Sequence, residues 1–121
     1  MKRYTISVTT AADGTATAYS PRRINGKINQ IEYVKGDFAD GVDFTIEGEA
    51  TGIDLWVEAN VNASAVRAPR QPTHTAVGAA ALYASGGVAV LDRIALANDR
   101  VKIGIAQGGN AKSGTFHVLV D

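Results

Sequence analysis

The segment most similar to a nucleotide-binding motif is residues 108–113, in which two glycines precede Lys112 and Ser113. A phosphate-binding loop needs a glycine directly before the lysine, and Ala111 stands there instead. Such a loop also joins a buried strand to the N-terminus of a helix, whereas this segment lies between two stretches that alternate as strands. We therefore interpret it as a polar connection of hairpin type and not as a phosphate site.

Histidine and carboxylate chemistry is limited by spacing. His74 and His117 form no helical i, i+4 pair, and neither has an acidic residue at a spacing diagnostic of a metal or catalytic site. Asp37 and Asp40 share a polar segment without the Asp-x-Asp-x-Asp-Gly pattern of a calcium loop. A carboxylate pair that forms only in space stays open as an alternative. We predict no catalytic residue, no cofactor and no metal site, and hence no enzyme.

The composition excludes several classes of protein. Twelve basic and twelve acidic residues give a formal net charge of zero, so no overall positive field attracts nucleic acid or an anionic membrane. The absence of cysteine removes disulfides and thiol chemistry. No window approaches the roughly 18 apolar residues of a membrane-spanning helix, and the first residues alternate instead of forming a signal peptide. We expect a soluble protein with no direct nucleic-acid partner and no membrane partner.

The elements that must position any site are β-strands, because apolar and polar residues alternate with period two along most of the chain. About six to eight strands are expected, with turns between them and no repeated helical pattern, as in sandwiches and jelly rolls. The faces predicted to point into the core are Tyr4/Ile6/Val8, Val42/Phe44/Ile46, Ile53/Leu55/Val57/Ala59, Val101/Ile103/Ile105 and Phe116/Val118/Val120.

Two dipeptides predict hairpins. Asp13-Gly14 would return the chain from the first strand through residues 15–19. Asn25-Gly26 suits the positive φ angles of a type I′ turn and would precede a strand over residues 27–34.

The predicted fold class is all-β: a single domain, residues 1–121, formed by an antiparallel β-sandwich or jelly roll with an irregular alanine-rich middle segment. This irregular excursion covers about residues 61–87. Its alanine-rich part, residues 76–84, is expected to contain one turn of helix or a short strand, because alanine favours helix whereas the nearby glycines oppose a long one.

Three features predict contact with other chains. Alternation places Trp56, the only tryptophan, on the polar face of its strand, where a partner, a second buried face or the middle segment would cover it. Residues 66–72 carry two prolines and two arginines and form either an extended arm or a rigid surface loop. The alanine-rich stretch exposes apolar surface that its own sandwich or another chain must cover. The candidate interface residues are Trp56, Arg67, Pro69, Arg70, Pro72, Leu82 and Tyr83.

Residues 2–10 and 14–19, together with residues 93–97, 106–109 and 112–118, resemble small structural proteins encoded in the head-gene region of tailed bacteriophages and prophages. The similarity spans nearly the whole chain. It implies a capsid decoration (cement) protein, a β-sandwich or jelly roll that binds the major capsid protein on the outside of the head, often as a dimer or trimer. No catalytic residues accompany this resemblance.

From the resemblance we expect a protein made in the bacterial cytoplasm and located on the capsid surface of the virion. Two alternatives remain at this stage. One is another virion part, such as a head-to-tail connector, a tail component or a fibre component. The other is a carbohydrate-binding β-sandwich module that presents Trp56 to a sugar.

Overall fold

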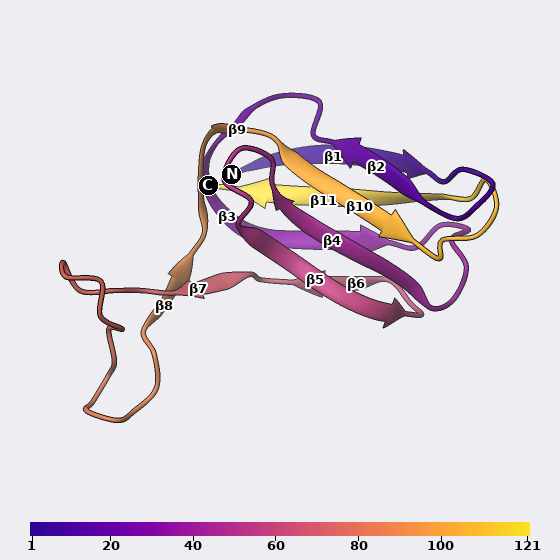
Figure 1. Ribbon diagram of the computed structural model, residues 1–121. Helices are drawn as coiled ribbons and strands as arrows, with labels where there is room; N and C mark the ends of the chain where they lie inside the picture. Colours follow the sequence, from indigo (N-terminus) through magenta and orange to yellow (C-terminus); the bar gives the residue numbers. More distant parts are fainter.

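The computed structural model describes residues 1–121 and consists of β-strands without any helix (Figure 1). The predicted all-β, sandwich-like fold is therefore confirmed. None of its elements is a helix that is long and apolar enough to cross a membrane. The strands are β1 (Lys2–Thr9), β2 (Ala16–Tyr19), β3 (Ile24–Val34), β4 (Val42–Gly48), β5 (Asp54–Val61), β6 (Ala65–Arg67), β7 (Arg70–Pro72), β8 (Leu91–Arg93), β9 (Ala95–Asp99), β10 (Val101–Ala106) and β11 (Ser113–Val120).

The strands form two antiparallel sheets that lie face to face (Figure 1). Sheet A has the order β1-β11-β3-β6, with β9 also pairing with β3, and sheet B has the order β2-β10-β4-β5. Strands β7 and β8 pair only with each other. The first and last strands of the chain are neighbours in sheet A, where Lys2 lies opposite Val120.

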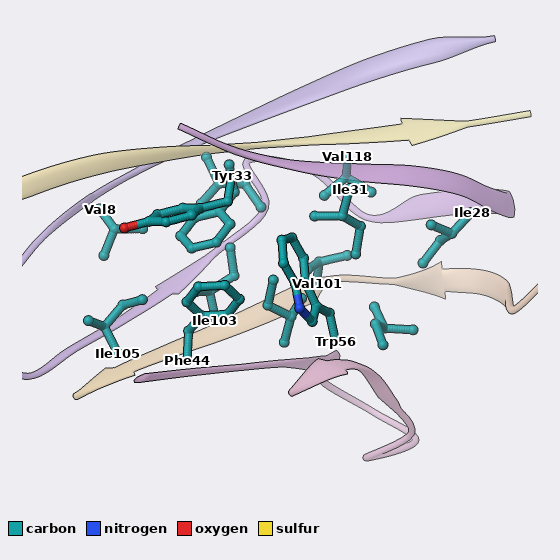
Figure 2. Packing of buried hydrophobic residues seen from close by; sticks show 14 of the residues in the cluster. Val8, Ile28, Ile31, Tyr33, Phe44, Trp56, Val101, Ile103, Ile105 and Val118 are labelled. Atoms are coloured by element: carbon teal, nitrogen blue, oxygen red, sulfur yellow. The ribbon is translucent and has the colours of Figure 1, made fainter. Parts of the chain in front are cut away.

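The core lies between the sheets, because the alternating apolar residues of both sheets point inward. It is a single cluster of 21 buried residues. The predicted inward faces of β4, β10 and β11 are all buried there, as are Ile6 and Val8 of β1. Tyr33 lies at its centre, with its ring centroid 5.1 Å from those of both Phe44 and Phe116. Figure 2 shows Tyr33, Phe44 and Trp56 between the strands of the two sheets.

The prediction of two hairpins is wrong. The turn at Asp13-Gly14 forms, with the Gly14 amide donating to the Ala11 carbonyl at 3.0 Å, but β1 pairs with β11 and β2 pairs with β10. This turn therefore carries the chain from sheet A to sheet B. The interpretation of residues 108–114 as a connection of hairpin type is wrong for the same reason: they cross between the sheets, because β10 belongs to sheet B and β11 to sheet A.

Asn25-Gly26 is not a turn either, because both residues lie inside β3, where the pairing register with β9 shifts. The positive φ that suggested a turn is present, at +135° for Gly26. Its cause is close packing: a Cβ on Gly26 would lie 2.1 Å from the carbonyl oxygen of Asp121. The glycine is thus required by the approach of the chain's last residue to β3.

The predicted inward face of β5 is wrong except at Leu55, and the predicted exposure of Trp56 is wrong as well. Ile46 of β4 lies opposite Trp56 and Glu47 lies opposite Asp54, so Leu55 is an extra residue on β5. Such a bulge places two neighbouring side chains on the same face of a strand. Leu55 and Trp56 are accordingly both buried. The residues Ile53, Val57 and Ala59, which were expected in the core, are exposed.

The irregular middle of the chain is a projecting arm, which we define as residues 70–93 (Figure 1). Strands β7 and β8 form its base, with Arg70 opposite Arg93 and Pro72 opposite Leu91. The excursion expected over residues 61–87 therefore begins and ends later than predicted, because β6 still belongs to sheet A. No helical turn forms over residues 76–84.

Candidate interaction surface

The buried position of Trp56 removes it from any surface. Its side chain is 6% exposed, and its ring meets the ring of Phe44 edge-on at a centroid distance of 4.8 Å. The indole N–H donates to Glu58 Oε1 at 2.9 Å, so the only polar atom of the indole is satisfied. The prediction that Trp56 is an interface residue is therefore wrong.

Arg67 covers this buried indole. Its guanidinium carbon lies 5.4 Å from the centre of the Trp56 ring, and its Nε and Nη2 donate to the two carboxylate oxygens of Glu58 at 3.2 and 3.3 Å. The hydrogen bond from the Trp56 indole, followed by the hydrogen bond and charge of Arg67, lowers the pKa of Glu58. Arg67 is therefore held against the sandwich by contacts within its own chain, and its side chain remains 48% exposed.

The segment around Pro69 fixes the arm to the sandwich. Pro69 is buried, and Arg70 Nη1 donates to the backbone oxygens of Pro69 at 2.8 Å and Asn29 at 3.3 Å. Of the predicted interface residues in this segment, only Pro69 is buried, whereas Arg67, Arg70 and Pro72 are exposed, and Pro72 stands at the end of β7. Residues 66–72 are thus an edge strand and the base of the arm, and the projecting part begins only after Pro72.

The tip of the arm holds five of the eleven large hydrophobic residues that are exposed in this chain. Residues 73–91 contain no Asp, Glu, Lys or Arg, although such residues make up 20% of the sequence. Within this stretch Val77 is 90% exposed, Tyr83 75% and Val88 73%. Leu82 and Leu91 are also exposed. The predicted residues Leu82 and Tyr83 therefore do lie on an open surface, together with three apolar residues that the sequence analysis missed.

Backbone hydrogen bonds give the tip its shape. Its three chain segments meet where the Thr73 amide donates to Val90, the Ala81 amide to Thr73 and the Val90 amide to Ala81, at 2.9 to 3.0 Å. Two short loops leave this junction, residues 74–80 and residues 82–89, and each is closed by a β-bridge. Figure 1 shows them as the two loops at the end of the arm. Because the backbone holds this shape, the side chains of the tip remain free to contact another molecule.

The groups considered for chemistry do not gather at one place. No three His, Cys, Asp or Glu side chains lie together as a metal site would require. His74 is on the arm, whereas His117 Nδ1 lies 3.0 Å from the Thr5 hydroxyl on sheet A. The surface has two shallow depressions, one beside Lys2 and Arg22 and one on sheet B around Gly104.

The chain was compared with known families, proteins and structures. No protein-family model, no curated protein and no solved structure matches it. The function of the chain is therefore inferred from its own geometry, above all from the arm.

Proposed function

We propose that this protein is a non-enzymatic structural protein of a bacteriophage virion, a capsid decoration protein that binds the outer surface of the major capsid protein shell. The observation that supports this most is the exposed, uncharged tip of the arm. The centres of protein interfaces are depleted in charged residues and enriched in aromatic and apolar ones. A tip with Val77, Tyr83 and Val88 in the open has that composition.

A second argument is the division of the chain into a rigid body and a projecting contact element. The sandwich buries its apolar residues in one core, so it does not need the arm for its own packing. Many copies of such a unit, each bound to the assembled shell and not to free subunits, stabilise the shell by mass action. The resemblance of the sequence to phage head proteins points to the same role.

The alternative of a sugar-binding module loses its main support, because it depended on an exposed Trp56 and the indole is buried. The alternative of a connector or tail part uses the same contact element. Copy number separates it from decoration, because a connector forms one closed ring whereas a decoration protein is repeated over the whole shell.

The test is binding to expanded, undecorated capsids assembled from the major capsid protein encoded in the same genome. We expect saturable binding of the purified wild-type protein, measured by co-sedimentation. A variant in which residues 73–90 are replaced by Asn-Gly should bind at least tenfold more weakly, since Pro72 and Leu91 are opposite each other and a two-residue turn can join them.

The matched control is Val66→Lys, which changes an exposed valine outside the arm and should leave binding unchanged. Absence of saturable binding by the wild type would refute the decoration role. Equal binding by the variant without the tip would show that the arm is not part of the contact.

A further inference from the structure

Gly104, in the middle of β10, is the one glycine of the 13 in the chain that its own fold does not require. Each of the others has either a positive φ or an atom that would lie within 3.0 Å of an added Cβ. At Gly104 the φ is ordinary, and the nearest atom to an added Cβ is the Thr45 carbonyl oxygen at 3.9 Å. Glycine weakens a strand interior and often marks a position that another backbone or ligand approaches closely.

The space above Gly104 is a recess on the outer face of sheet B. Thr17 of β2 and Thr45 of β4 flank the glycine in the paired strands. The recess has a volume of about 370 Å³, and its other outward-facing residues are Thr15, Asp43 and Ala106. The missing side chain thus leaves a hollow where a flat sheet face would otherwise lie.

The recess suits an uncharged occupant. Its floor is glycine and its walls are threonine side chains, which offer hydroxyl and methyl groups. The single carboxylate at its rim, Asp43, already accepts hydrogen bonds from the Asn60 amide at 2.8 Å and from Gln107 Nε2 at 3.2 Å. A cation would therefore have to compete with partners that Asp43 already has.

We propose that the recess around Gly104 binds the tip of the arm of a second copy of this chain. The tip projects and carries no charged residue, and the recess is concave with an uncharged floor. The two surfaces are therefore complementary in shape, and contact between them would not bury a charge on the tip or on the floor of the recess. The arm points away from its own sandwich (Figure 1), which leaves the recess open to a neighbour. The inference rests on the proposed function in one respect, namely that the arm is an assembly element. A tip held in the recess of a neighbouring copy links the copies on the shell, so loss of the tip weakens capsid binding because the copies no longer bind as a linked array.

The symmetry of the assembly follows from the two surfaces being different. An arm on one copy and a recess on the next form a heterologous contact, which gives a ring if the rotation between copies closes and an open filament if it does not. Several copies held on one shell would engage in this way at a high effective concentration.

The experiment is sedimentation velocity over a range of concentrations of wild type and Gly104→Thr. Threonine fills the recess and favours strand structure, so the variant should melt at the same or a higher temperature while associating at least tenfold more weakly. Ser7→Thr adds a methyl to the exposed outer face of sheet A and should change neither property. A wild type that stays monomeric at all concentrations, or a Gly104→Thr variant that associates normally, overturns the proposal.

A mixing experiment covers the case in which Gly104→Thr destabilises the fold. Gly104→Ala adds only one methyl group, and a copy lacking residues 73–90 retains an intact recess. Neither variant should self-associate well, yet an equimolar mixture should form a heterodimer through one arm and one recess. No heterodimer in the mixture overturns the arm-to-recess contact.

Failure of the arm-to-recess contact can be told apart from failure of the decoration role. Self-association without capsid binding would refute the decoration role and leave this contact standing. Capsid binding by a strictly monomeric protein would do the reverse.

Discussion

Replacement of Trp56 by alanine tests the bulge that turns the indole into the core. Trp56 is 6% exposed, whereas its neighbour Val57 is 57% exposed. Truncation of a buried tryptophan costs about 3–5 kcal/mol of unfolding free energy. Truncation of an exposed valine should cost less than about 1 kcal/mol. The unfolding entropy of a chain of 121 residues is about 0.25 kcal/mol/K, so Trp56→Ala should lower Tm by about 12–20 °C and Val57→Ala by at most about 4 °C.

The measurement is thermal and urea unfolding followed by far-ultraviolet circular dichroism. Fluorescence is unsuitable because Trp56 is the only tryptophan and the variant lacks it. Val57→Ala is the matched control, since simple alternation would place Val57 in the core and Trp56 outside. If Val57→Ala destabilised the protein as much as Trp56→Ala, the bulged register of β5 would be wrong.

Three further substitutions test the packing and the titrating groups. Gly114→Ala should cost about 1–3 kcal/mol in urea unfolding, because its Cβ would lie 2.4 Å from the ring of Phe38; an unchanged midpoint would contradict this packing. Burial raises the pKa of Tyr33 from 10.0 to about 12, so the unfolded state loses its proton first and stability falls as pH rises through that range. Tyr33→Phe removes a buried hydroxyl without a partner and should flatten this alkaline loss in thermal melts; an identical alkaline slope would refute the assignment. The pKa of Glu58 lies below its ordinary value of 4.5, so the stability it contributes is present above that value and disappears as pH falls through the folded pKa. Wild type should therefore exceed Glu58→Gln in Tm at neutral pH but not in acid, and a difference that persists in acid would argue against this linkage.

The sequence predicted the regular part of the fold because one face of each long strand is buried. Phe44 on β4, Ile103 on β10 and Phe116 on β11 belong to alternating runs that the core confirms. Period two is a local property of an extended chain, so it can be read without knowledge of the partner strands. The all-β class followed from the same local signal.

The strand partners and the position of Trp56 could not be predicted in this way. The first strand pairs with residues more than 100 positions away, as the contact between Thr5 and His117 shows, and a local turn at Asp13-Gly14 carries no information about that. The bulge at Leu55 depends on the register with β4, which exists only after the sheet has formed.

Part of the interaction surface was readable from the sequence and part was not. Leu82 and Tyr83 were predicted as interface residues because the alanine-rich stretch carries apolar surface that its own sandwich or another chain must cover, and both are exposed. The absence of charged residues over residues 73–91 was a further signal in the sequence. It would have added Val77, Val88 and Leu91 to the predicted interface residues. The contacts of Arg67 with Trp56 and Glu58 could not be predicted because they arise from tertiary structure.

The pairing of β1 with β11 determines when the protein can fold during its synthesis. Residues Lys2–Thr9 have their hydrogen-bonding partner only in residues Ser113–Val120, so sheet A cannot be completed until β11 has left the ribosome. Folds dominated by such distant contacts form slowly, because closing a long loop costs entropy before any contact is gained. The apolar side chains of β1 therefore stay without their final neighbours until β11 has been made, which gives a chaperone that binds short apolar segments a long time to bind β1.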